Sequence, residues 1–123
     1  MPHPLLDRIL AAEDYAAGGT PVEIPEWGIT SEHGARLIPM TGFNRARIEE
    51  ISSKASGGGG HDLDFRTKVI AWSLVDPDGA RIIGDGDIPK LRERNGVVLD
   101  RLFDAALKVN KMDKKSLEEA AGN

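Results

Sequence analysis

Residues 62–75 read DLDFRTKVIAWSLV, and this stretch decides how the chain folds. It opens with Asp62, a residue type that caps helix N-termini. Apolar residues follow at helical spacing in two adjoining stripes, namely Phe65, Val69 and Trp72, and Ile70 and Leu74. The pattern predicts a helix over residues 62–75 that is apolar on more than one side, with Trp72 in the core.

The sequence after this stretch predicts a turn and further helices. Residues 76–79 read DPDG, which places Asp, Pro and Gly at the positions that a type I turn prefers. A short extended piece over residues 80–83 leads to a helix over 88–94, and the Asp residues before it suit a positive helix end. A long amphipathic helix is predicted over 97–111 and a short one over 114–121. We expect these segments to form a compact helical unit.

The sequence before residue 62 mixes helix and strand patterns. Apolar residues recur at helical spacing over residues 5–17, so a first helix is expected there, ended by two glycines. Val22 and Ile24 alternate with polar residues, and residues 35–40 supply a returning strand after a turn at 31–34. This predicts a small β-hairpin. Thr41 then suits the cap of a helix over 43–54.

Four consecutive glycines, Gly57 to Gly60, separate the two parts of the chain. So many glycines lose too much backbone entropy to form a helix or strand, so residues 56–61 are predicted to be a flexible loop. Each side alone is too short for a secure core, and we therefore expect a single domain over residues 1–123. The expected fold class is α+β, mostly α, with an N-terminal helix and small β-hairpin followed by the compact helical unit.

Composition excludes several classes of protein. The 123 residues carry 16 Lys and Arg against 20 Asp and Glu, giving a formal net charge of −4. A nucleic-acid binder needs a basic surface to neutralise phosphates, so no nucleic-acid partner is expected. No apolar run approaches the roughly 20 residues that cross a bilayer, so we expect no membrane association and a cytoplasmic location. Cysteine is absent, which excludes disulfides and thiolate chemistry.

Catalytic patterns are not found in the sequence. His3, His33 and His61 fall in a terminus, a turn and the glycine loop, where nothing fixes their geometry. No serine stands in a Gly-x-Ser-x-Gly elbow. We therefore expect no catalytic residue and a protein that is not an enzyme.

An acidic group consisting of Asp76, Asp78, Asp85 and Asp87 suggests a metal site. Calcium loops of the EF-hand type need Gly at the sixth position and Glu at the twelfth. Counted from Asp76, those positions hold Arg81 and Asp87. The acidic residues are better explained as one turn and one helix cap, so neither a metal nor a cofactor is expected.

Three residues are candidates for contact with a protein partner. Trp27 follows Pro25 near the end of a predicted strand, where a core position and a binding position are both open. Met112 precedes the charged run 113–119 near the end of the chain and Leu117 lies within it, and both would offer a binding surface if they stay exposed. The predicted partner-binding residues are therefore Trp27, Met112 and Leu117.

Taken in order, these segments resemble a known family. The stretches that carry the resemblance are VEIPEWG at 22–28, AWSLVDPDGARII at 71–83, LDRLFDAA at 99–106 and EEAAGN at 118–123. The chain resembles the tail assembly chaperones of long-tailed phages, of the siphovirus type also found in prophages. The resemblance covers nearly the whole chain and is strongest from residue 62 onward.

The resemblance implies a non-catalytic role. Proteins of this family coat the long helical tape measure protein before the tail tube polymerises around it, keep it soluble in the host cell cytoplasm, and are absent from the mature virion. It also implies a homo-oligomer, and association with a longer form made by ribosomal frameshifting. Gly122-Asn123 at the end of the sequence fits the slippery sequence GGGAAAC read as Gly-Asn, which gives a hypothesis for the frameshift site.

Two other functions stay open at this point. One is a structural tail or connector protein of a phage virion. The other is a small enzyme or metal-binding protein that uses residues 76–87.

Overall fold

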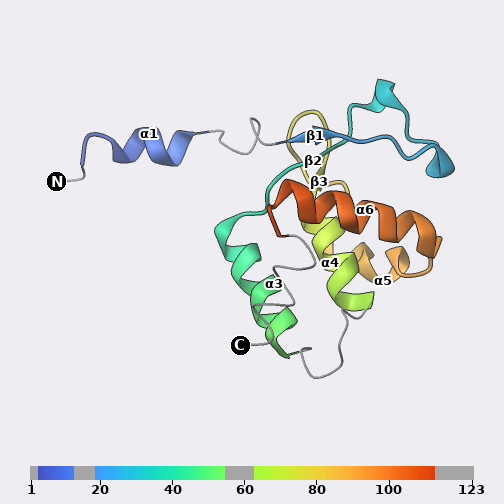
Figure 1. Ribbon diagram of the computed structural model, residues 1–123. Helices are drawn as coiled ribbons and strands as arrows, with labels where there is room; N and C mark the ends of the chain where they lie inside the picture. Colours follow the sequence, from blue (N-terminus) through green and yellow to red (C-terminus); the bar gives the residue numbers. More distant parts are fainter. Residues whose placement is uncertain (1–2, 13–18, 55–62, 113–123) are drawn as a thin grey trace.

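The computed structural model describes residues 3–12, 19–54 and 63–112. Along the chain the elements are α1 (Leu6–Ala11), β1 (Thr20–Pro21), η1 (Pro25–Trp27), η2 (Ser31–His33), β2 (Arg36–Leu37), α3 (Gly42–Lys54), α4 (Leu63–Ser73), β3 (Leu74–Val75), η4 (Asp85–Asp87), α5 (Ile88–Leu91) and α6 (Gly96–Val109). Figure 1 shows a helical body topped by a small sheet, with α1 standing apart from it. The expected α+β, mostly α class is confirmed.

Helix α4 is the centre of the core, as its sequence predicts. It packs against α6, α3 and α5. Phe65, Val69 and Ile70 are fully buried, and Trp72 is 5% exposed. The ring of Phe65 meets that of Phe103 on α6 edge to face, with centroids 5.7 Å apart. Each large apolar side chain buried in this way contributes about 1.5–3 kcal/mol to folding.

Helix α6 has the apolar face that its spacing predicts. Val98, Leu99, Leu102, Phe103, Ala106 and Leu107 are its buried residues. The Asn95 side chain caps its start and accepts hydrogen bonds from the backbone N–H groups of Val97 and Val98, at 2.8 and 3.3 Å. Capping satisfies donors that a helix end otherwise leaves unpaired, which fixes where α6 begins.

Asn110, just after α6, joins three parts of the fold and is only 3% exposed. Its Oδ1 accepts a hydrogen bond from the Met40 backbone N–H at 2.6 Å. Its Nδ2 donates to Ser73 Oγ at 3.0 Å and to the Ala106 carbonyl at 2.8 Å. One buried amide thus holds the end of α6 to the end of α4 and to the segment that enters α3.

The sheet contains a strand that the sequence pattern did not predict. Its order is β1-β2-β3, with both pairs antiparallel. The expected helix over 62–75 is too long, because α4 ends at Ser73 and the next two residues form β3. Leu74 and Val75 pair with Leu37 and Arg36 of β2. Leucine and valine continue a buried helix or a buried strand equally well, and the partner β2 decides between them.

The predicted hairpin is present with a different register. Its strands are Thr20–Pro21 and Arg36–Leu37, so Val22 and Ile24 lie just beyond β1. Ile24 instead forms an isolated bridge with Ile29, around the tight turn of η1. The connection uses two glycines in the left-handed region, Gly28 at φ 72° and Gly34 at φ 67°. Only glycine adopts that conformation without strain. The expected turn at 31–34 is present, and a second turn over Pro25–Gly28 precedes it.

The remaining helices follow the predicted order with shorter bounds. Helix α3 begins at Gly42, and its start is held by Thr41, whose Oγ1 accepts from the Asn44 N–H at 3.2 Å. Helix α5 covers only Ile88–Leu91 of the predicted 88–94. Residues 13–17 of the first predicted helix, the glycine loop 56–61, the Asp62 cap and the last predicted helix lie outside the described residues.

Candidate interaction surfaces

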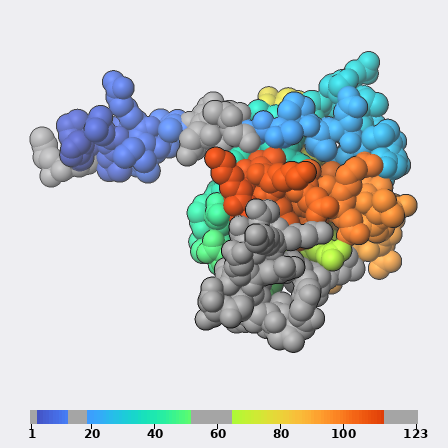
Figure 2. Space-filling view, in the orientation of Figure 1, coloured from blue at the N-terminus to red at the C-terminus, as the bar shows by residue number. Residues whose placement is uncertain are grey.

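The described part of α1 is an amphipathic helix without a buried residue. Its large apolar side chains are exposed, Leu5 by 54%, Leu6 by 37%, Ile9 by 68% and Leu10 by 73%. Figure 2 shows this segment projecting from the rest of the molecule. Single exposed apolar residues are ordinary, but a cluster on one short helix makes α1 a candidate interaction surface.

Trp27 is half buried and lies at the end of η1, against the core. The residue before it fixes this turn to α6, because both Nη atoms of Arg101 donate to the Glu26 carboxylate, at 2.6 and 2.8 Å. These hydrogen bonds lower the pKa of Glu26 to about 2 and raise that of Arg101. The sequence left both a core position and a binding position open for Trp27. In the structure one part of its side chain packs against the core and another part is exposed.

The other two predicted binding residues have different outcomes. Met112 is 3% exposed and belongs to the core, so the exposed surface expected there is absent and this prediction is wrong. The chain reverses after α6 through Lys111, at φ 56°, and the Met112 N–H donates to the Leu107 carbonyl at 2.8 Å. This reversal turns the Met112 side chain inward. Leu117 lies outside the described residues.

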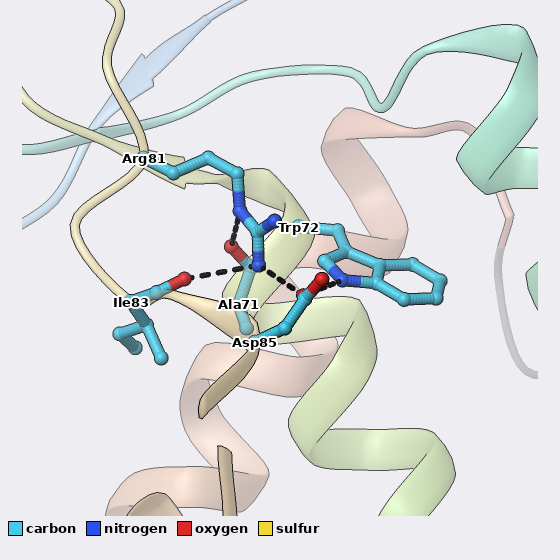
Figure 3. A network of polar contacts seen from close by, with 5 residues as sticks. All are labelled: Ala71, Trp72, Arg81, Ile83 and Asp85. Atoms are coloured by element: carbon cyan, nitrogen blue, oxygen red, sulfur yellow. Dashed lines mark hydrogen bonds and ion pairs between the residues drawn. The ribbon is translucent and has the colours of Figure 1, made fainter. Parts of the chain in front are cut away.

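A polar network joins Trp72, Arg81 and Asp85 (Figure 3). The indole Nε1 of Trp72 donates to Asp85 Oδ1 at 3.1 Å, and Arg81 Nη2 donates to the same oxygen at 2.9 Å. Arg81 also donates to the carbonyls of Ala71 and Ile83, at 3.3 and 3.0 Å. The hydrogen bonds from Trp72 and Arg81 lower the pKa of Asp85. The network fastens the loop after β3 onto the end of α4.

The four Asp residues of the acidic group therefore act separately. Asp76 Oδ1 accepts from the N–H groups of Asp78 and Ala80, both at 2.9 Å, and its carbonyl accepts from Gly79 at 3.0 Å, which confirms the turn. Asp87 precedes α5 but makes no side-chain capping bond, so that part of the prediction is wrong. Within the described residues no three His, Cys, Asp or Glu side chains are grouped to hold a metal.

A shallow pocket of about 300 Å³ lies beside this network. It is lined by Arg47, Lys68, Trp72, Asp85, Ile88, Pro89 and Arg92. Arg47 of α3 lies over the Trp72 ring, 5.1 Å from its centroid, and near the Phe43 ring at 5.9 Å. The Phe43 side chain itself is 74% exposed.

Sequence reasoning found Trp72 as a core residue but missed everything that surrounds its indole. Arg81 and Asp85 stand four residues apart, a spacing that signals an ion pair on a helix. Here Arg81 lies in a loop and Asp85 begins η4, so the pair does not lie on one helix and the helical spacing rule did not predict it.

No protein-family model matches the chain, and no curated protein matches its sequence. A solved structure matches the fold, that of the bacteriophage HK97 tail assembly chaperone, with a TM-score of 0.60 and 23% sequence identity. The match covers 87% of this chain and 98% of that chain.

The chain has the fold of a phage tail assembly chaperone. The resemblance seen in the sequence is thus confirmed at the level of the fold. Separately, no helix in the described segments is long and apolar enough to span a membrane.

Proposed function

We propose that this protein is a tail assembly chaperone of a long-tailed phage or prophage. It binds the tape measure protein and keeps it soluble during tail morphogenesis. The observation that carries this proposal is the fold, which matches the HK97 tail assembly chaperone over 87% of this chain. In this proposal the protein acts by binding and catalyses no reaction.

The exposed apolar residues of α1 support a client-binding role. A long helical client with an apolar stripe aggregates in water unless that stripe is covered. Ile9 and Leu10, 68% and 73% exposed, offer apolar surface that a helical client can cover. The exposed part of Trp27 is a second contact in this proposal.

The wider role follows from the same proposal. The chaperone acts in the host cytoplasm, self-associates, and works beside a longer form made by frameshifting. It is displaced when the tail tube polymerises and does not remain in the mature virion. A structural tail or connector protein would instead remain in the mature virion.

The deciding experiment is co-expression with the tape measure protein encoded beside this gene. We expect the tape measure protein to be soluble and to co-purify with this chain, and to be insoluble alone. Replacing Ile9 and Leu10 together by Gln is expected to abolish co-purification, while Arg8→Gln on the same helix is expected to preserve it. A tape measure protein that is equally soluble and unbound with and without this chain would refute the proposal.

A second measurement separates the chaperone from a virion component. Purified particles should lack this chain. Its presence in stoichiometric amounts would make it a structural tail or connector protein.

A further inference from the structure

The chain leaves α6 through a turn that contains a strained residue. Lys111 has φ 56°, and in the described segments it is the one residue other than glycine with a positive φ. A side chain in the left-handed region lies too close to its own backbone, so glycine is preferred at this position after a helix. The Lys111 side chain is exposed. Contacts of the neighbouring residues must therefore hold the strained turn in place.

Two hydrogen bonds and one buried side chain hold this turn. The Lys111 N–H donates to the Lys108 carbonyl at 3.1 Å, and the Met112 N–H donates to the Leu107 carbonyl at 2.8 Å. This pair of bonds is the Schellman motif, which ends many helices when the residue after the cap is left-handed. Met112, 3% exposed, then lies in the core together with Leu107. Burial of Met112 therefore offsets the strain at Lys111.

The same four backbone groups can bond in a second way. If Lys111 takes the right-handed conformation, α6 continues through Met112 and each N–H bonds to the carbonyl four residues earlier. Lys111 then donates to Leu107, and Met112 donates to Lys108. These are the two donors and two acceptors that are already paired in the turn. Neither form leaves one of these four groups unpaired, so the strain at Lys111 and the burial of Met112 decide between the two forms.

Continuation of α6 moves Met112 from the core to the outer side of the helix. Residues four apart lie one above the other on a helix. Residue 112 then follows Lys108, which is exposed, whereas the buried side of α6 runs through Phe103 and Ala106. Burying a methionine side chain and relieving one left-handed residue have free energies of similar size. The two forms therefore differ little in free energy.

We propose that residues 110–112 are a two-state element of the fold. It keeps Met112 in the core while Lys111 is left-handed, as in the structure, and it carries Met112 to the surface when α6 continues. The continued form is a minor state of the free chain. Any interaction that favours a longer α6 raises the population of this state. The inference rests on the end of α6 alone and does not depend on the proposed function.

Oxidation by dilute hydrogen peroxide measures the minor state in the full chain. A methionine thioether is oxidised to the sulfoxide according to its exposure, and mass spectrometry of peptides gives the rate for each methionine. Met40 is the internal reference, because it is buried in the same core and is 8% exposed. We expect Met112 to be oxidised faster than Met40, although it is the less exposed of the two in the structure. Equal rates would mean that both react only after global unfolding, and this result would overturn the proposal.

Lys111→Gly and Lys111→Ala form a matched pair of variants. Both remove the same charged side chain, but only glycine removes the left-handed strain. Lys111→Gly should slow the oxidation of Met112 about five- to thirtyfold, the factor that corresponds to the strain of one residue. Lys111→Ala keeps the strain and should change the rate less than about threefold. Equal effects of the two variants would show that strain does not set the balance, which would also overturn the proposal.

Hydrogen exchange separates continuation of α6 from fraying of its end. Fraying frees the Met112 N–H and the Met112 thioether together, whereas continuation keeps the N–H bonded to Lys108. We therefore expect the Met112 amide to be protected from exchange more strongly than its thioether is protected from oxidation, each relative to the chain unfolded in urea. Equal protection of the amide and the thioether would assign the exposure to fraying and would leave no second folded form.

Discussion

Gly34 and Gly28 offer a paired test of how the hairpin is packed. Both have left-handed backbones, at φ 67° and φ 72°. A Cβ at Gly34 would lie 2.5 Å from Cγ of Pro77, whereas a Cβ at Gly28 would meet nothing within 4 Å. Replacing each by Ala therefore imposes the same backbone strain but adds a steric clash at only one of them.

The expected magnitudes follow from this difference. A left-handed non-glycine residue costs about 1–2 kcal/mol, so Gly28→Ala should lower the free energy of unfolding by roughly that amount. Gly34→Ala adds overpacking against a stiff ring, which costs typically about 1–3 kcal/mol more. The second variant should therefore be the less stable of the two by about 1–3 kcal/mol.

Urea unfolding, followed by circular dichroism, measures both variants. Pro77→Ala removes the Cγ that clashes, so in the Gly34→Ala background it should recover part of the loss, giving a favourable coupling of at least about 0.5 kcal/mol. Equal destabilisation by the two glycine variants, or strictly additive effects in the double variant, would refute the close approach of Gly34 to Pro77.

Two further predictions concern the polar contacts that hold the fold together. Asn110→Leu leaves the buried Met40 N–H and Ser73 hydroxyl without their partner, so it should cost about 2–4 kcal/mol in urea unfolding, while Lys108→Ala on the exposed side of α6 should change stability by less than about 0.5 kcal/mol. A loss below about 1 kcal/mol for Asn110→Leu would contradict its role. Glu26 has its pKa lowered from 4.5 to about 2 by Arg101, so its pairing stabilises the fold fully above pH 4.5 and loses this effect as the pH falls through about 2. The difference in melting temperature between wild type and Glu26→Gln should therefore shrink over that range, and a difference that stays constant down to pH 2 would contradict the pairing.

The helical part of the fold was predictable because its information is local. The apolar spacing of residues 62–75 and 97–111 predicts two helices, and α4 and α6 form the core with Phe65 against Phe103. The turn at Asp76 was equally predictable, since its side chain bonds to the backbone of its own turn.

The sheet was only partly predictable, because pairing depends on distant residues. Leu74 and Val75 continue the apolar pattern of α4, and only their pairing with β2, almost forty residues earlier, makes them a strand. The hairpin register was missed for a related reason. Gly28 and Gly34 each close a short turn, and no local pattern indicates how the two turns divide the connection.

The candidate surfaces were the least predictable feature. Met112 was a binding candidate on the condition that it stays exposed, but the left-handed Lys111 reverses the chain and Met112 lies in the core. Trp72 was correctly placed in the core, whereas the pairing of its indole with Asp85 spans a strand and a loop. The periodic spacing of apolar residues does not indicate a contact of this kind.

The isolation of α1 has a thermodynamic consequence for release. A helix of six residues with no buried side chain is marginally stable in water, because nucleation is costly and packing contributes nothing. If a partner covers its apolar face, part of the binding free energy is used to order the segment. Such coupling lowers affinity for a given contact area and keeps the complex reversible. Under the proposed function, a chaperone that holds a client and then releases it to a growing polymer benefits from that weakness.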